Sequence, residues 1–114
     1  MAALETFENA YPDREYEIDI TCPEWTAVCP KTGQPDFGTI HIRYVPLKRC
    51  VELKSLKLYL FAFRDKGVFH ETVTNQILDD FVKACQPARA VVEGCFNVRG
   101  GITTKVTARY EKNV

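Results

Sequence analysis

The sequence lacks a charge excess, a long apolar run and a secretion signal. Its 15 Lys and Arg residues match its 15 Asp and Glu residues, so the formal net charge is zero. A protein that binds mainly nucleic acid usually needs a basic excess, so that class is disfavoured. The longest apolar run, Leu58–Phe63, is far shorter than the roughly 20 residues that cross a bilayer. The N-terminus has neither the basic region nor the apolar stretch of a signal peptide, so we expect a cytoplasmic protein.

Cysteine and histidine are present, but not in the pattern of a disulfide scaffold or a structural zinc site. The five cysteines are odd in number, and no two have Cys-x-x-Cys spacing. Only His41 and His70 could add imidazole ligands, so we predict no metal centre. We expect most of the cysteines to be small core residues. They are Cys22, Cys29, Cys50, Cys85 and Cys95.

Length and hydrophobicity favour one folded domain. The chain has 114 residues, of which 46% are hydrophobic, so one core can form and disorder is disfavoured. We find no internal repeat and no low-complexity segment. We predict an irregular N-terminal arm over residues 1–15 and a single domain over residues 16–114.

Alternation of apolar and polar residues predicts four strands in two hairpins. The first strand begins at Tyr16 and the second covers about Phe37–Val45, with a loop rich in proline and glycine between them. The turn of the second hairpin is Arg99-Gly100-Gly101, whose glycines supply positive φ angles. The last two strands alternate through Val92, Gly94, Phe96, Ile102, Thr104, Val106 and Ala108.

A change of period between the hairpins predicts two helices. We expect Gly67 to end the first helix and Pro87 to block the second. The first apolar stripe is Leu53, Leu56, Leu60 and Phe63, and the second is Val73, Ile77, Leu78, Phe81, Val82 and Cys85. The order β-β-α-α-β-β indicates an α+β fold, a four-stranded antiparallel sheet covered on one face by two helices. Its exposed edges predict an oligomer, and a monomer with charged edges is the alternative.

The loop between the first two strands carries a candidate nucleophile. Cys29 precedes Pro30 and Lys31, and a nearby positive charge can lower a thiol pKa and favour the thiolate. Asp36 lies seven residues on, where the loop can bring a carboxyl near the thiol. A thiol beside a proton donor is a workable catalytic pair. The alternative is a solvated loop in which Asp36 caps a turn.

Two further segments could bind ligands. Lys54 and Lys57 share a helix face, which suits a phosphate-bearing ligand, although solvated lysines of an amphipathic helix fit the same pattern. Glu52 would lie at that helix's N-terminus, where a carboxylate is favoured. His70 and Glu71 begin the second helix, and Glu71 either complements the helix dipole or accepts the N–H donors of a planar heterocycle.

These segments together resemble one family. Val28–Phe37 (VCPKTGQPDF) resembles the catalytic loop of the 7-cyano-7-deazaguanine reductases, the nitrile reductases of queuosine biosynthesis. Glu52–Tyr59 (ELKSLKLY) is similar to that family's signature segment, which is tied to its nicotinamide cofactor. Phe69-His70-Glu71 and Arg99-Gly100-Gly101 also match, so the resemblance covers roughly residues 16–112. It implies the tunnelling fold, which is shared with pterin and purine enzymes, and it implies the short, single-domain form of this family.

The resemblance implies a role for each candidate residue. Cys29 would be the nucleophile, and Asp36 would give a proton to the nitrile nitrogen. The deazaguanine pocket would be lined by Val51, Glu52, Leu53, His70 and Glu71, with Glu71 gripping the guanine edge. The phosphates of NADPH would be held by Lys54, Lys57 and Arg99. The resemblance further implies a homo-oligomer of stacked pentameric rings, with the pocket completed by a neighbouring subunit and no nucleic acid or membrane partner.

The chemistry of these residue types is consistent with nitrile reduction. Thiolate addition converts the nitrile to a thioimide, whose C=N bond can accept hydride. Release as an imine and a second reduction would give 7-aminomethyl-7-deazaguanine, so two NADPH would be consumed. Three alternatives are an amidinotransferase with the same nucleophile, a zinc cyclohydrolase of the same fold, and a non-enzymatic redox-sensing domain with a reactive Cys29. The signature lysines disfavour the first, and the shortage of histidines disfavours the second.

Overall fold

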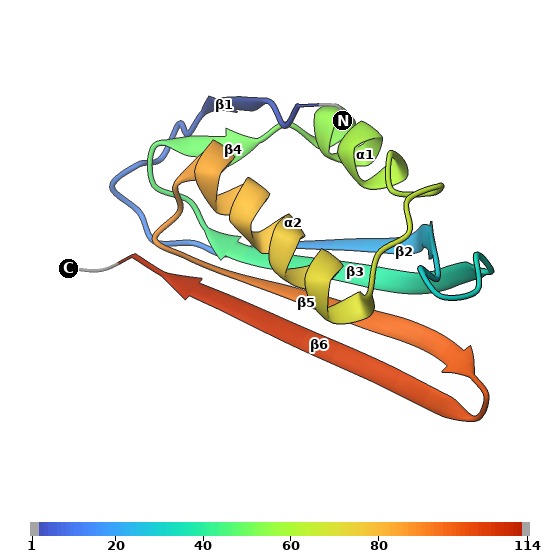
Figure 1. Cartoon of the computed structure of the whole chain (residues 1–114). Coiled ribbons are helices and arrows are strands. Elements are labelled where there is room, and N and C mark those ends of the chain that lie inside the picture. Colours follow the sequence, from blue (N-terminus) through green and yellow to red (C-terminus); the bar gives the residue numbers. More distant parts are fainter. Residues whose placement is uncertain (1–2, 113–114) are drawn as a thin grey trace.

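The computed structural model describes residues 3–112, which form two antiparallel sheets and two helices (Figure 1). The main sheet has four strands in the order β2-β3-β5-β6, and α2 lies across one of its faces. The elements in chain order are β1 (Thr6–Glu8), β2 (Ile18–Val28), β3 (Pro35–Val45), β4 (Arg49–Val51), α1 (Leu53–Phe61), α2 (His70–Cys85), β5 (Arg89–Arg99) and β6 (Ile102–Glu111). The predicted α+β class is confirmed, with two short strands added. Neither described helix is long and apolar enough to cross a membrane.

The first hairpin is longer than its alternation predicts. β2 pairs with β3 from Ile18 to Val28, with an irregularity between Cys22 and Trp25. The pattern predicts only the first half of β2, because the irregularity interrupts the alternation. β3 begins at Pro35, earlier than expected. Its core-facing residues are Asp36, Gly38, Ile40, Ile42 and Tyr44, so the inward face of β3 includes a carboxyl group.

The second hairpin turns where the glycines predict. Gly100 has φ +56° and Gly101 has φ +80°, the positive values that a tight hairpin turn needs. The tip of the hairpin projects past the helices in Figure 1. Ile102 is accordingly 68% exposed, and of the alternating residues Ile102, Thr104, Val106 and Ala108 of β6 only Ala108 is buried.

Two expectations for the first helix are wrong. Leu53 belongs to the predicted apolar stripe but is 62% exposed. Gly67 does not end the helix, because α1 already ends at Phe61 and Ala62 caps it. Phe63 lies beyond the helix and is nevertheless buried, packing on Trp25 with ring centroids 6.1 Å apart. The helical spacing of buried residues therefore continues past the end of α1 into a turn. The sequence alone does not distinguish such a turn from a further turn of helix.

The second helix matches its prediction and forms the core with the sheet. It ends at Cys85, and Gln86 has φ +46° before Pro87. Its stripe is buried apart from the half-buried Val82. Each fully buried large apolar side chain contributes roughly 1.5–3 kcal/mol. Close packing depends on Gly94 of β5, where an added Cβ would lie 2.7 Å from the Phe96 ring.

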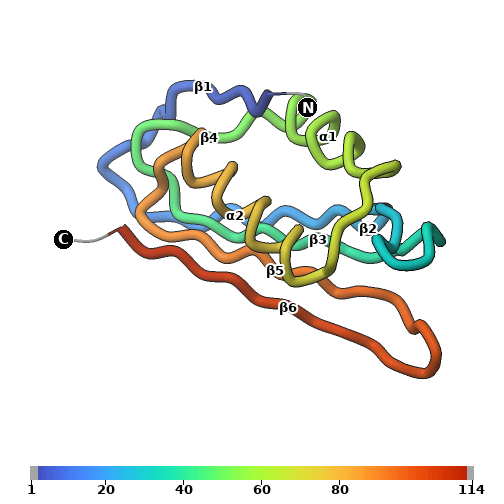
Figure 2. The backbone as a smooth tube through the Cα atoms, viewed as in Figure 1, coloured from blue at the N-terminus to red at the C-terminus, as the bar shows by residue number. Residues whose placement is uncertain are grey.

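The N-terminal segment is not irregular throughout, contrary to the prediction. β1 pairs antiparallel with β4, which places Thr6 opposite Val51, and Figure 2 shows these two strands side by side. The Glu52 N–H donates to the Glu5 carbonyl at 2.9 Å, which links this segment to the start of α1. Asn9 is buried, and its Nδ2 donates to the Leu47 carbonyl at 2.8 Å. A three-residue strand is too short to show alternation in the sequence. The ends of the predicted arm and domain, residues 1–2 and 113–114, lie outside the described residues.

Two of the five cysteines are buried in the core, and the other three are only partly buried. All five are free thiols. Cys50 and Cys85 are buried as expected, and burial raises the pKa of Cys85 to about 12. Cys22 is partly buried against the core. Cys29 and Cys95 are only half-buried, so the core prediction does not hold for them.

Candidate active site

The Cys29 loop closes on itself through backbone hydrogen bonds. The Cys29 N–H donates to the Gln34 carbonyl at 2.8 Å, and the Gly33 N–H donates back to the Cys29 carbonyl at 2.8 Å. Gly33 has φ +73°, a left-handed conformation that glycine adopts without strain. The loop is also attached to the segment before α2, because the Val68 N–H donates to the Val28 carbonyl at 3.2 Å.

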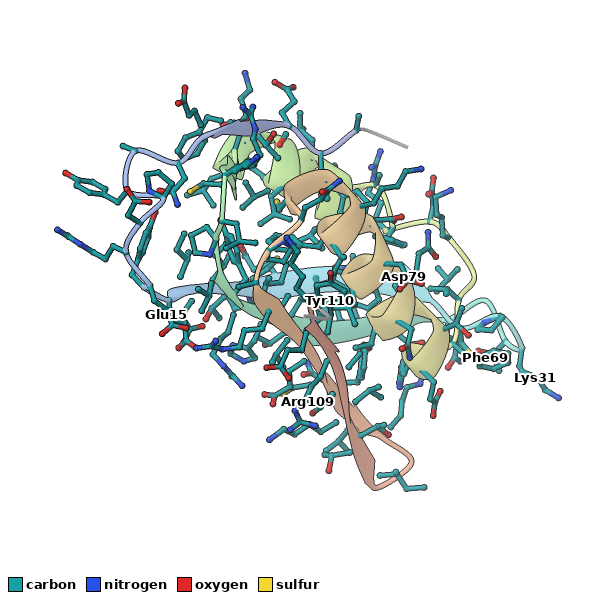
Figure 3. The ribbon with its side chains drawn as sticks, turned by 90° about the vertical axis from the view of Figure 1, so that its left-hand side faces the viewer. Glu15, Lys31, Phe69, Asp79, Arg109 and Tyr110 are labelled. Carbon is teal, nitrogen blue, oxygen red and sulfur yellow. The ribbon has the colours of Figure 1, made fainter. Side chains whose placement is uncertain are left out.

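The loop lowers the pKa of the Cys29 thiol. The largest cause is a hydrogen bond from the Thr32 side chain, followed by hydrogen bonds from the backbone N–H groups of Lys31 and Thr32. Desolvation and the negative charge of Asp36 act weakly in the opposite direction. The lowered pKa agrees with the prediction, but its cause does not. The contribution of Lys31 comes from its backbone, and its side chain points outward in Figure 3.

Asp36 is the point at which three elements meet. Its carboxyl group is buried because Asp36 shares the inward face of β3. Arg99 Nη1, from the end of β5, donates to Asp36 Oδ1 at 2.6 Å. His70 Nε2, from the start of α2, lies 3.5 Å from Asp36 Oδ2. The His70 ring is stacked on Phe96 with centroids 3.8 Å apart, which fixes the imidazole plane.

The structure separates the three cations that the resemblance assigns to the cofactor. Arg99 contacts the Cys29 loop, because it donates to the Pro35 carbonyl at 2.7 Å and to Gln34 Oε1 at 2.5 Å as well as to Asp36. Lys54 and Lys57 lie on α1, at the opposite side of the structure from the β5–β6 tip in Figure 1. Neither lysine takes part in an ion pair between residues 3 and 112.

The residues assigned to the substrate fall into two groups. Val51, Glu52 and Leu53 lie where β4 meets α1, and Val51 is buried. Glu52 caps α1 as predicted for its place at the helix N-terminus: its carboxylate accepts from the N–H groups of Lys54 at 2.9 Å and Ser55 at 2.7 Å. These backbone hydrogen bonds lower the pKa of Glu52. The carboxylate is therefore already occupied within the chain.

The second group, His70 and Glu71, begins α2. Glu71 is exposed in the first turn, and its carboxylate makes no hydrogen bond or ion pair to any described residue. It borders a shallow hollow of about 520 Å³ on the outer face of α2. Within residues 3–112, no hydrogen bond joins this group to the β4–α1 group.

A larger groove lies between β2 and α1. It has a volume of about 570 Å³ and contains neither Cys29 nor Asp36 in its lining. Lys57, Leu53 and Phe61 border it from α1, and Trp25 borders it from β2. The groove places one signature lysine beside an apolar surface, which suits an organic ligand that carries phosphate.

Sequence reasoning missed three contributors to the site. The Thr32 side chain hydrogen-bonds to Cys29, and Gln34 Oε1 accepts a hydrogen bond from Arg99. The Phe96 ring stacks on the imidazole of His70. Thr32 and Gln34 belong to the loop segment already singled out, so the segment itself was the available signal. Phe96 was placed only on one face of a strand, and nothing in the spacing indicates that an imidazole would stack on it.

Comparisons with known proteins agree with the fold and with the resemblance. The family described as QueF-like protein matches residues 35–114. The NADPH-dependent 7-cyano-7-deazaguanine reductase of Chlorobaculum tepidum is 59% identical over 110 residues, which covers 96% of this chain and 94% of that protein. The protein of the same name from Anaeromyxobacter sp. is 65% identical over 107 residues, 94% of this chain and 88% of that one. A crystal structure of the apo archaeosine synthase QueF-Like superimposes with a TM-score of 0.79 at 17% identity, covering 86% of this chain and 96% of that one. This structural match confirms the predicted tunnelling fold.

Proposed function

The chain belongs to the QueF-like family, and we infer that it is an oxidoreductase that uses NADPH to reduce the nitrile of 7-cyano-7-deazaguanine in queuosine biosynthesis. The product is the amine, 7-aminomethyl-7-deazaguanine. The observation that carries the mechanism is the Cys29 loop, which lowers the pKa of the thiol and leads, at the start of β3, to the buried carboxyl group of Asp36. Relatives near 60% identity over almost the whole chain support the reaction, and the 17% identical structure supports the fold alone.

Cys29 is the nucleophile in this proposal. Its thiolate forms a bond to the nitrile carbon, and the nitrile nitrogen takes up a proton, which gives a thioimide bound to Sγ. The Thr32 hydroxyl and the loop N–H groups stabilise the thiolate before attack. After the first reduction the carbon–sulfur bond breaks, Sγ leaves as a thiolate and the substrate becomes an imine. The second reduction gives the amine.

Asp36 gives the proton to the nitrile nitrogen. In the structure Arg99 occupies Asp36 Oδ1 and His70 lies beside Oδ2. We propose that Arg99 leaves Asp36 for a cofactor phosphate, because a doubly charged phosphate is a stronger partner for a guanidinium group. This exchange would reconcile the observed contact of Arg99 with the cofactor role that the resemblance implies. It would also free Oδ1 to face the substrate.

Lys54 and Lys57 would hold the remaining phosphates of NADPH, each molecule of which would supply one hydride, so that two are consumed per nitrile. The two ammonium groups fit this task because they are exposed, one turn apart on α1 and free of ion pairs among residues 3–112. Lys57 also borders the groove between α1 and β2, where a nicotinamide or adenine ring could pack.

The substrate pocket is shared between subunits in this proposal. The deazaguanine is enclosed by residues of two chains. One chain contributes Val51, Glu52 and Leu53, and the other contributes His70 and Glu71. The free carboxylate of Glu71 accepts two N–H donors from the guanine edge. β2 and β6 are the edge strands of the sheet, so pairing of one chain's β2 with the next chain's β6 can close a ring. We propose stacked pentameric rings, and a cytoplasmic location, where the five thiols stay reduced.

The test is to mix the full chain with 7-cyano-7-deazaguanine and NADPH. We expect two NADPH oxidised per nitrile, and a covalent adduct by mass spectrometry when NADPH is omitted. Cys29→Ala should lose both signals, whereas Cys22→Ala, a matched change at another half-buried cysteine, should keep them. Adduct formation without NADPH oxidation would instead support the amidinotransferase. An adduct that persists in Cys29→Ala would place the nucleophile elsewhere.

A further inference from the structure

The sheet has one face without helices, and three chemically reactive side chains lie on it. Residues that face α2, such as Ile40 of β3 and Gly94 of β5, are buried in the core. Their neighbours in each strand point the other way, because side chains alternate across a strand. His41, Glu93 and Cys95 therefore share the open face, and each is half-buried.

Strand pairing brings the three side chains together. His41 of β3 is directly opposite Glu93 of β5, and Cys95 lies two residues further along β5 on the same face. One imidazole nitrogen, one carboxylate oxygen and one Sγ lie within 4.8 Å of one another. Thr21 of β2 is opposite His41, and its Oγ1 lies 3.2 Å from His41 Nδ1, which orients the ring. Ligating histidines are commonly held by such a second partner.

We propose that His41, Glu93 and Cys95 form a binding site for one zinc ion, with water as the fourth ligand. Nitrogen, sulfur and carboxylate oxygen are the ligand atoms that zinc uses, whereas calcium and magnesium prefer oxygen alone. Zinc bonds of about 2.0–2.3 Å place the ligands of a tetrahedral site roughly 3.3–3.6 Å apart. Cys95 Sγ already lies 3.6 Å from Glu93 Oε1.

Charge and protons balance in this site. The Cys95 thiol donates to Glu93 in the metal-free chain and would lose its proton to solvent on binding. A thiolate, a carboxylate and a neutral imidazole then carry two negative charges, which match Zn²⁺. Lys105 of β6 is opposite Cys95, and its Nζ lies 3.6 Å from Glu93 Oε2. This ammonium competes with the metal, but its side chain is 63% exposed and can move into solvent.

The proposal goes beyond nitrile reduction and is tested without it. The full chain, kept reduced with a thiol-free phosphine, is titrated with Co²⁺ and then with Zn²⁺ against a chromophoric chelator. We expect one Co²⁺ per chain with a thiolate charge-transfer band, displaced by Zn²⁺, and a higher thermal midpoint with zinc. His41→Asn, Glu93→Gln and Cys95→Ser should each weaken binding at least about tenfold, since even second partners of ligands cost that much.

Three further variants keep the test decisive. Lys105→Met changes an exposed residue and removes the competing cation, so zinc should bind up to about fivefold more tightly, the range of one exposed ion pair. Cys29→Ser and Cys22→Ser should leave the charge-transfer band intact. Absence of zinc binding, a band lost with Cys29 instead of Cys95, or unchanged affinity in both Cys95→Ser and Lys105→Met would overturn the site.

Discussion

Arg99 and Asp36 are 63 residues apart in sequence, yet Arg99 Nη1 lies 2.6 Å from Asp36 Oδ1. The Asp36 side chain is only 8% exposed, so this ion pair is largely shielded from water on the carboxylate side. The contact ties the turn of the second hairpin to the first residues of β3. It places a cation assigned to the cofactor directly on the residue assigned to proton transfer.

Removal of Arg99 should destabilise the fold. Arg99→Ala leaves a buried carboxylate without its main partner, which costs about 1–3 kcal/mol of unfolding free energy. Arg89 offers a matched control, because it pairs with Glu15 at 2.9 Å and both side chains are exposed. Arg89→Ala should cost less than about 1 kcal/mol. Urea unfolding measures both values, and equal costs would contradict the shielding of Asp36.

Thr32 should set the pH at which Cys29 reacts. Thr32→Val removes the largest cause of the lowered thiol pKa, so the pKa of Cys29 should rise toward its ordinary value. The rate of alkylation by iodoacetamide, followed against pH, should then begin to rise at a higher pH than in the unmodified chain. Lys31→Gln is the control and should leave the profile in place, because the backbone of Lys31 and not its ammonium group acts on the thiol. A shift with Lys31→Gln alone would reverse this assignment.

Asp36→Asn should slow adduct formation and the reduction that follows it. The amide keeps the size of the side chain but cannot supply the acidic proton. Because the nitrile nitrogen takes up a proton as the thioimide forms, we expect the covalent adduct to form more slowly in Asp36→Asn and NADPH oxidation to fall by about 10²–10⁴-fold. Mass spectrometry and absorbance of the cofactor measure the two steps. Full reductase activity in this variant would remove Asp36 from the mechanism.

The lysines of α1 should act on the cofactor and not on the nitrile. The double variant Lys54→Ala, Lys57→Ala should raise the KM for NADPH while adduct formation in the absence of NADPH stays unchanged. Lys83→Ala, an exposed lysine in the last turn of α2, is the control. Arg99→Ala should show the same preference for the cofactor if the guanidinium leaves Asp36 for a phosphate. Equal losses for both ligands would count against the phosphate role.

Glu71 should act on the substrate. If its free carboxylate accepts two N–H donors in a closed pocket, Glu71→Ala should lower nitrile affinity by about 2–5 kcal/mol. Asp79, an exposed acid two turns further along α2 (Figure 3), is the control, and Asp79→Ala should have little effect. Calorimetric titration of both variants in the Cys29→Ala background measures binding without the covalent step. Similar losses in both would indicate a general effect of charge.

Local patterns in the sequence predict most of the elements, because hairpins and amphipathic helices have short repeats. The turn at Gly100 and the stripe of α2 are both confirmed. The prediction fails where the local pattern is interrupted, as at the Cys22 irregularity, or where one contact replaces a repeat, as in β1. The exposed Leu53 shows that hydrophobic periodicity also assigns to the core residues that lie on the surface.

The site was predictable by segment but not by contact. The motif around Cys29 predicts a nucleophile, which stays a prediction, and the inward face of β3 explains why Asp36 is buried. The contact between Arg99 and Asp36 depends on strand pairing far along the chain, which no spacing reveals. The prediction that the charge of Lys31 lowers the pKa of Cys29 is wrong. The direction in which a side chain points from a turn cannot be predicted from its charge.

The pairing of β1 with β4 has a practical consequence for expressing this protein. Glu5 joins the amino-terminal segment to the first turn of α1 through the Glu52 N–H and through its own N–H, which donates to Ser55 Oγ at 2.9 Å. Trimming the chain to begin at β2 would delete no residue assigned to catalysis, yet it would loosen the helix that carries Lys54 and Lys57. Versions shortened at the amino end would therefore be poor starting material for measuring cofactor affinity.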